Sequence, residues 1–140
     1  MKIVICGSMK LSKRMIEVRD ELVKFGHEII LPRHTKEYAE MNTADHIHNE
    51  SVKNKVNNDL IRDYYNEIAQ NDAILVVNDD LNEVAGYIGG NSFLEMGFAH
   101  VLNKKIYLLN NIPECSYKDE LVAMQLVILN GDFSKICAVK

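Results

Sequence analysis

The chain has 140 residues, of which 47% are hydrophobic and 26% are charged. This length and balance are typical of one globular domain, here residues 1–140, and exclude a disordered or fibrous chain. Acidic residues outnumber basic ones by 20 to 16, and the net charge of −4 argues against a nucleic-acid partner held by bulk positive charge. No apolar run reaches the ~18 residues that a membrane span needs. The 3 cysteines lack metal-ligand spacing and favour a reducing, cytoplasmic compartment.

Short apolar segments alternate along the chain with segments whose apolar residues recur every three or four positions. The first kind is typical of buried strands and the second of amphipathic helices. In chain order, the sequence predicts a strand at residues 2–6, a helix at 11–25 ended by Gly26, a strand at 27–31, a polar excursion at 33–50, a helix at 52–68, a strand at 73–77, a glycine-rich loop, a helix at 91–103, a strand at 106–109, a short helix at 118–124 and a strand at 126–129.

This alternation of strands and helices predicts the fold class. Apolar strands without strict alternation belong to parallel sheets that are covered on both faces. We therefore expect a single α/β domain of the flavodoxin or Rossmann-like kind, with a five-stranded parallel sheet and helices on both faces. Ligands of such sheets bind beyond the carboxyl ends of the strands, where the strand order switches. Three loops should line a site there: residues 7–10, 78–91 and 110–116.

The turn after the first strand, Gly7-Ser8-Met9-Lys10, has the composition of an anion site. Backbone N–H groups at a helix start, a hydroxyl and an ammonium group suit a phosphate. The alternative is an ordinary strand-to-helix turn in which Ser8 or Ser12 caps the helix. The turn contains neither G-x-G-x-x-G nor the Walker lysine motif.

Glu95 stands among apolar residues at the start of a helix that should be buried. A buried carboxylate is costly unless it is paired or its pKa rises, so Glu95 is a candidate catalytic group. The alternative is that Ser92 and Glu95 form a capping box, in which the glutamate bonds back to the N-cap N–H.

Other carboxylates lie close to the expected site. Asp79 and Asp80 follow the third strand, and Asp63 lies on the preceding helix. Two carboxylates from different elements can act as ionised nucleophile and proton donor. The alternative for each is a solvated charge on a loop or helix face. The histidines lack the ligand spacing of zinc motifs, so no metal site is expected.

Taken together, these segments resemble the nucleoside 2-deoxyribosyltransferase-like superfamily, which includes the 2′-deoxynucleoside 5′-phosphate N-hydrolases. Residues 6–10, Cys-Gly-Ser-Met-Lys, are similar to the hydrolases' phosphate-binding Cys-Gly-Ser loop. Residues 95–99, Glu-Met-Gly-Phe-Ala, are similar to the segment around the family's catalytic glutamate, and residues 71–77 to the strand before its active-site loop. The resemblance implies a flavodoxin-like fold and cleavage of an N-glycosidic bond.

The resemblance also implies roles for individual residues. Glu95 would attack C1′ of the sugar and form a glycosyl-enzyme, as the carboxylate of a retaining glycosidase does. Asp63 matches a helper aspartate with a one-residue gap, and Asp79 or Asp80 would protonate the leaving base. Substrate contacts are expected from Gly7, Ser8, Met9, Lys10, Gly90, Asn91 and Ser92. No cofactor is implied, whereas a homodimer or larger homo-oligomer is, because family sites are completed across a subunit interface.

Some positions depart from the family pattern. Asn91 stands where glycine is usual, Gly89 where the hydrolases have serine, and Val4 where the first strand carries tyrosine. The segment at residues 121–124, Leu-Val-Ala-Met, replaces the one from which the neighbouring subunit supplies a serine.

The expected function is N-glycosidic cleavage of a nucleoside or nucleoside 5′-monophosphate, by hydrolysis or deoxyribosyl transfer. Hydrolysis is preferred because Ser8 and Lys10 suit a 5′-phosphate. One alternative is a non-catalytic nucleotide-binding or sensor module. Another is a phosphoribohydrolase resembling the lysine-decarboxylase-like family, whose Pro-Gly-Gly-x-Gly-Thr spacing the chain does not meet.

Overall fold

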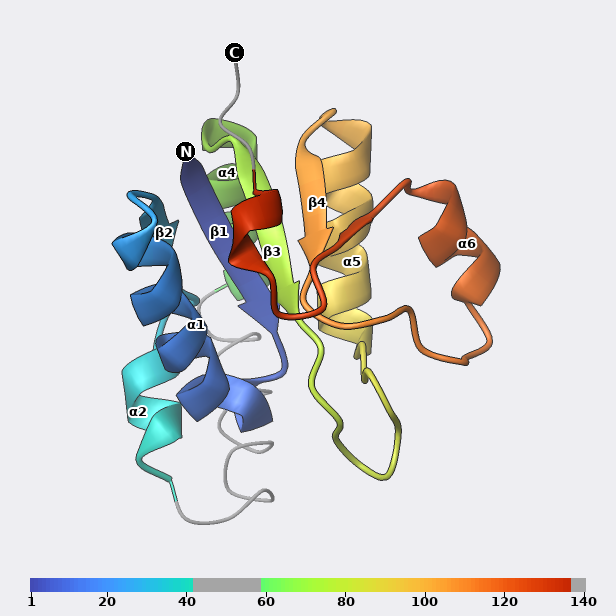
Figure 1. Ribbon diagram of the computed structural model, residues 1–140, viewed down its shortest axis with the longest axis horizontal. Helices are drawn as coiled ribbons and strands as arrows, with labels where there is room; N and C mark the ends of the chain where they lie inside the picture. The colour runs from blue at the N-terminus through green and yellow to red at the C-terminus, as the bar shows by residue number, and fades with distance from the viewer. Residues whose placement is uncertain (42–58, 137–140) are drawn as a thin grey trace.

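The computed structural model describes residues 1–41 and 59–136 (Figure 1). Five parallel strands form one sheet in the order β2-β1-β3-β4-β5, which confirms the predicted sheet. The strands are β1 Lys2–Gly7, β2 Glu28–Ile30, β3 Ala73–Val77, β4 Lys105–Leu108 and β5 Val127–Ile128. The helices are α1 Ser12–Lys24, α2 Thr35–Ala39, α4 Leu60–Gln70, α5 Gly90–Val101 and α6 Lys118–Ala123, with short 3₁₀ helices η1 at Met9–Leu11 and η2 at Phe133–Lys135.

The predicted elements and the observed ones agree closely where the structure describes the chain. The helix expected over residues 52–68 is found from Leu60 onward as α4, and the polar excursion contains α2. Residues 52–58 of that helix and residues 42–50 of the excursion, with His46 and His48, lie outside the described residues. No helix in the described part of the chain is long and apolar enough to cross a membrane.

Both faces of the sheet are covered by helices. Side chains alternate along each strand, so each strand contributes apolar residues to both faces. On β1, Ile3 and Ile5 face α1, where they pack with Met15, Val18 and Leu22 in one apolar cluster. Val4 and Cys6 face the other way and pack with Ile68 of α4 and with Met96 and Ala99 of α5. Figure 1 shows α1 in front of the sheet and α4 and α5 behind it. Burial on both faces explains why the strands read as continuous apolar runs.

Gly26 ends α1 as the sequence predicts. Its φ of +88° lies in the left-handed region that favours glycine. The Gly26 N–H donates to the Val23 carbonyl at 2.9 Å and the His27 N–H to the Leu22 carbonyl at 3.2 Å. These two bonds form a Schellman motif, which turns the chain directly into β2.

The strand order places a crevice between β1 and β3. The chain leaves β1 toward β2 on one side of it, whereas β3 continues toward β4 on the other side. The loops after β1 and β3 therefore diverge at the carboxyl edge, and such a switch point is where parallel α/β sheets bind ligands.

Candidate functional site

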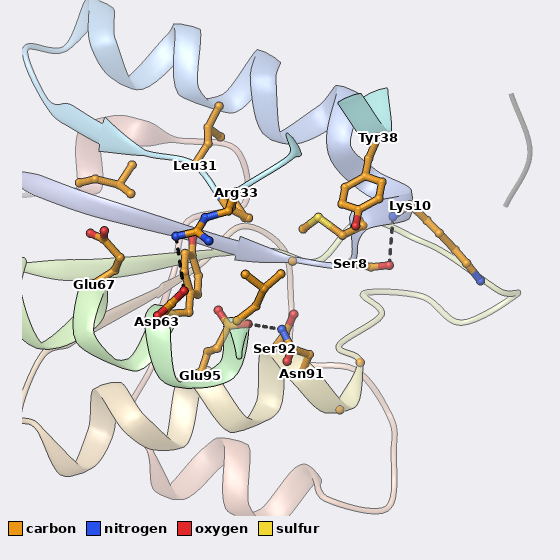
Figure 2. Close-up of a pocket in the computed structure, with 18 of the residues that line it drawn as sticks. Ser8, Lys10, Leu31, Arg33, Tyr38, Asp63, Glu67, Asn91, Ser92 and Glu95 are labelled. Atoms are coloured by element: carbon orange, nitrogen blue, oxygen red, sulfur yellow. Dashed lines mark hydrogen bonds and ion pairs between the residues drawn. The ribbon is translucent and has the colours of Figure 1, made fainter. Parts of the chain in front are cut away.

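A cavity of about 500 Å³ opens at this switch point. Its walls come from the turn after β1, the segment after β2, α2, α4, the predicted loop after β3 through Asn82, Tyr87 and Gly89, and the start of α5 (Figure 2). Glu95 and Asp63, two of the four predicted catalytic carboxylates, line it. It is also lined by all the residues that were predicted to contact substrate: Gly7, Ser8, Met9, Lys10, Gly90, Asn91 and Ser92.

Glu95 is buried, with 4% of its surface exposed, on the inner side of α5. The helix begins at Gly90 and its N-cap is Gly89, which provides no side-chain cap. Ser92 therefore lies inside the helix, and the alternative that Ser92 and Glu95 form a capping box is wrong. Instead, the Asn91 amide Nδ2 donates a hydrogen bond of 2.5 Å to Glu95 Oε1 (Figure 2). The carboxylate of Glu95 thus lines the cavity rather than tying down its own helix start.

Two protonated groups lie beneath Glu95. The Cys6 thiol of β1 is hydrogen-bonded to Glu95, and its pKa is raised well above 9.0 by burial first, then by the Glu95 charge and by that bond. The Tyr64 hydroxyl of α4 donates to the Ile5 carbonyl. Its pKa is raised well above 10.0, mainly by burial and then by the charges of Cys6, Glu95 and Glu67. Both groups therefore keep their protons at neutral pH and act as donors.

The turn after β1 combines a structural and a ligand-facing role. Ser8 has extended backbone angles, and its hydroxyl accepts from the Lys10 N–H at 3.3 Å as the cap of η1. An accepting hydroxyl keeps its own O–H to donate to a ligand. Ser12 does not cap α1, because its hydroxyl donates to the Met9 carbonyl. A Cβ at Gly7 would lie 3.1 Å from the Val77 carbonyl oxygen, so a larger residue there would force β1 and β3 slightly apart.

The cations of the cavity differ from those expected. Figure 2 shows the Lys10 side chain extending away from Asp63 and Glu95. Arg33 instead directs its guanidinium to Asp63, with Nη2 and Oδ2 3.4 Å apart and both side chains about half-exposed. Arg33 lies in the aperiodic polar excursion, which is why the sequence analysis missed it. Its position could have indicated this role, because Arg33 is a basic residue that directly follows Pro32 at the carboxyl end of the second strand.

Aromatic side chains add flat apolar surface to the cavity wall. Tyr38 of α2, which is 2% exposed, and Tyr64 and Tyr87 all line the cavity. Tyr38 was missed because five-residue helices such as α2 are too short to produce a clear apolar period. Such rings offer faces on which a base can stack.

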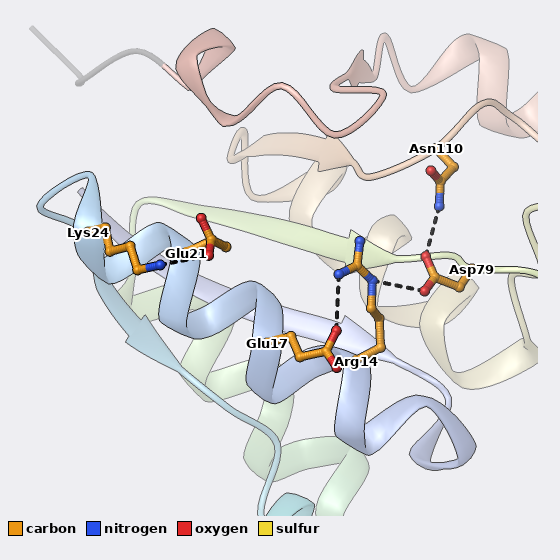
Figure 3. Close-up of polar contacts among 6 residues, drawn as sticks. All are labelled: Arg14, Glu17, Glu21, Lys24, Asp79 and Asn110. Atoms are coloured by element: carbon orange, nitrogen blue, oxygen red, sulfur yellow. Dashed lines mark hydrogen bonds and ion pairs between the residues drawn. The ribbon is translucent and has the colours of Figure 1, made fainter.

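Asp79 and Asp80 are not brought to the cavity, which corrects the expectation that one of them protonates a leaving base. Asp79 Oδ2 accepts from Arg14 Nε at 2.9 Å and Oδ1 from Asn110 Nδ2 at 3.0 Å, and Figure 3 shows Asp79 between these two partners. Asp80 Oδ1 accepts from the Gly86 N–H at 2.9 Å. Arg14 belongs to α1, so the ion pair draws Asp79 toward the face of the sheet opposite to α5.

The loop at residues 110–116 does not line the cavity either. It is tied to Asn78, which is fully buried at the end of β3. Asn78 Oδ1 accepts from the Asn110 N–H at 2.8 Å, and Asn78 Nδ2 donates to the Asn111 carbonyl at 3.1 Å. Gly86 has φ +67°, and a Cβ there would lie 2.9 Å from that same carbonyl oxygen. This Asn78 network holds the glycine loop in the course that leads to the start of α5.

Within the described ranges, no group of three His, Cys, Asp or Glu side chains could hold a metal ion. The polar side chains that line the cavity include carboxylates at Glu95, Asp63 and Glu67, cations at Arg33 and Lys10, and the Ser8 hydroxyl.

No protein-family model matches the sequence, and no curated protein matches it. Among solved structures, the chain is similar to FerB from Paracoccus denitrificans, a flavoenzyme NAD(P)H:(acceptor) oxidoreductase. The identity is 13% and the TM-score 0.49, over 91% of this chain and 74% of FerB. A likeness this distant carries no argument about the activity or cofactor of this chain.

Proposed function

We propose that the protein cleaves the N-glycosidic bond of a nucleoside or nucleoside 5′-monophosphate, with Glu95 as the nucleophile. The observation that carries the proposal is a buried carboxylate lining a cavity of about 500 Å³ together with the turn at Gly7, Ser8, Met9 and Lys10. This volume lies within the range of roughly 300–1,000 Å³ that is usual for small-molecule sites. The resemblance of the residues around Glu95 to a catalytic segment supports the same role.

The proposed reaction has two steps. A Glu95 oxygen attacks C1′ of the sugar, and the C1′–N bond breaks with its electron pair leaving on the base, which takes up a proton. Water then attacks C1′, the ester bond to Glu95 breaks, and the sugar leaves with a new hydroxyl. This sequence is that of a retaining glycosidase. Asp63 is the second predicted carboxylate that lines the cavity, so we assign it the proton given to the base and then taken from the water.

The cation content of the cavity favours a phosphorylated substrate and hydrolysis over transfer. The Ser8 hydroxyl can donate to a phosphate oxygen, and the guanidinium of Arg33 suits a phosphate better than an ammonium because its donors form a planar fork. Arg33 is paired with Asp63 through a single long contact of 3.4 Å. It can therefore reorient toward an arriving anion.

We also propose that the chain forms a homodimer or larger homo-oligomer. The residues at 121–129 that could have formed a contact include the fully buried Leu121 and Leu129, which belong to the core. Exposed apolar side chains instead gather on α4 and α5, which pack side by side. They are Ile61, Tyr65, Leu94 and Val101, with Tyr65 and Phe98 in edge-to-face contact at 5.3 Å. Exposed apolar patches of this kind mark association surfaces.

A base-release screen tests the proposed function. Purified protein is incubated with ribo- and deoxyribonucleosides and their 5′-monophosphates, and the free base is measured by chromatography. We expect release from at least one substrate and none from Glu95→Gln. Absence of release from every compound, at enzyme loadings that detect slow turnover, contradicts the proposal. Stabilisation by nucleotides without turnover would then favour a binding module, whereas a strict preference for ribonucleotides would favour a phosphoribohydrolase.

A further inference from the structure

The surroundings of Glu95 conflict with the negative charge that its proposed role needs, so other groups must stabilise that charge. This inference rests on the proposed function. Glu95 is 4% exposed, and its neighbour Met96 is fully buried in the apolar cluster that also contains Cys6 and Ala99. Burial in such surroundings disfavours a carboxylate ion unless hydrogen bonds to the charged form offset the lost hydration. A nucleophile must be ionised and must also point at one carbon atom.

Two donors reach the Glu95 carboxylate from different elements. Asn91 lies four residues earlier on α5 and so shares its helix face, and its Nδ2 lies 2.5 Å from Glu95 Oε1. Cys6 lies on β1 beneath the helix, is fully buried, and belongs to the same apolar cluster as Met96 of α5. The Glu95 carboxylate raises the pKa of its thiol through its charge and through a side-chain hydrogen bond, so the thiol is placed as a donor to Glu95. One donor belongs to the cavity wall and the other to the sheet.

We propose that Asn91 and Cys6 are positioning residues that together hold the Glu95 carboxylate ionised and oriented toward the cavity. Hydrogen bonds donated to a carboxylate favour its charged form. Donors on two different elements also restrict rotation about the side-chain bonds more than a single i, i+4 contact does. We call this arrangement the two-donor clamp, and neither donor needs to touch the substrate.

The local structure gives Asn91 no capping role. The N-cap of α5 is Gly89, and the helix start carries no side-chain cap. Asn91 also stands where the family pattern has glycine. A glycine at this position would remove the amide donor, so the clamp is a property of this chain rather than of the pattern that it resembles.

The amide half of the clamp is tested by Asn91→Ala, with Asn66→Ala as the matched control. Asn66 is exposed on α4 and does not line the cavity. A hydrogen bond to a charged group corresponds to a loss of about 10-fold to 100-fold in kcat. We expect that loss in Asn91→Ala with KM little changed, and the acid limb of the pH–rate profile moved up by about one pH unit. An acid limb and kcat equal to those of wild type overturn the amide half.

The thiol half is tested by comparing Cys6→Ser with Cys6→Ala. Serine keeps a donor at this position and alanine removes it, whereas both remove the sulfur from the core. We expect the acid limb of Cys6→Ser to stay near that of wild type and the acid limb of Cys6→Ala to move to higher pH. Equal profiles for the two variants overturn the thiol half. Thermal unfolding of both variants, followed by circular dichroism, verifies that each is folded at the assay temperature.

A third measurement separates the clamp from the proposed function because it needs no substrate. The Glu95 carboxyl carbon is followed by NMR across pH in protein labelled with ¹³C-glutamate, with Glu95→Gln identifying the signal. An upward shift of its titration midpoint in Asn91→Ala supports the clamp even if wild type releases no base, in which case the proposed function alone fails. Base release by wild type together with an unchanged midpoint in both Asn91→Ala and Cys6→Ala overturns the clamp alone.

Discussion

Two groups of carboxylates lie at the same edge of the sheet and have different surroundings. Glu95 and Asp63 line the cavity, and Glu95 is almost completely buried. Asp79 and Asp80 directly follow β3 yet are satisfied by fixed partners, Asp79 by Arg14 and Asn110 and Asp80 by the Gly86 N–H. Proximity to a strand end is therefore a poor guide to chemistry. A carboxylate that lines a cavity is available to a ligand, whereas a carboxylate that is hydrogen-bonded to fixed donors of the protein is not.

The difference follows from the strand order. The loops after β1 and β3 leave in different directions and open a crevice, whereas the loops after β3 and β4 run together and are joined by Asn78. The first region is arranged to receive a molecule and the second to hold a loop. Substitutions in the two regions should accordingly affect different properties.

The largest expected contrast is between Glu95→Gln and Asp79→Asn. Removal of the proposed nucleophile should lower base release by about 1000-fold or more while the protein stays folded. Asp79→Asn should leave base release near the wild-type value and lower the free energy of unfolding by about 1 kcal/mol, because its ion pair is partly exposed. Chromatographic assays and urea titrations measure the two effects. A loss of activity in Asp79→Asn equal to that in Glu95→Gln would break the comparison.

Asn78→Ala should have the next largest effect, on stability. The substitution removes the acceptor of the Asn110 N–H and the amide donor of the Asn110 and Asn111 carbonyls, in a buried place. We expect the free energy of unfolding to fall by about 3 kcal/mol. The exposed Asn66→Ala should change it by less than about 0.5 kcal/mol. Equal urea midpoints for these two variants would show that the Asn78 network does not hold the loops.

Asp63→Asn should lower kcat by about 100-fold, the lower part of the range for a lost proton-transfer group. The matched variant is Asp80→Asn, which removes a carboxylate outside the cavity. Its base release should stay within about twofold of wild type, since Asp80 does not line the cavity and its Oδ1 accepts from the Gly86 N–H. If base release falls more in Asp80→Asn than in Asp63→Asn, the proton donor lies on the loop after β3 and not on α4.

The smallest expected effect is a decrease in the free energy of unfolding at alkaline pH. It is caused by two buried groups beside the cavity. The pKa values of Cys6 and Tyr64 are raised above their ordinary values of 9.0 and 10.0, mainly by burial. Unfolding therefore releases protons once the pH exceeds the unfolded values, so this stability is intact below about pH 9 and decreases as the pH rises further. Urea titrations from pH 8 to 11 should show a decrease, and Cys6→Ser with Tyr64→Phe should flatten it. An unchanged slope in the double variant would assign the effect to other groups.

The sequence alone determined the parallel five-stranded fold and half of the candidate site. Apolar runs at residues 2–6 and 73–77 and the glycine at residue 26 predict strands and a helix end because these signals are local. Glu95 was found because a charge among apolar residues is costly wherever the helix packs. The turn at residues 7–10 was found because parallel sheets bind ligands at the carboxyl ends of their strands.

Tertiary structure alone decided which side chains share the cavity. Arg33 and Tyr38 reach it from a segment without period, and Asp79 is withdrawn from it by Arg14, 65 residues earlier in the chain. Whether Glu95 caps its helix or faces a cavity depended on where the helix begins, since its N-cap is Gly89, three residues before Ser92. Such outcomes depend on distances between elements that are far apart in the chain, and local patterns of polarity do not encode those distances.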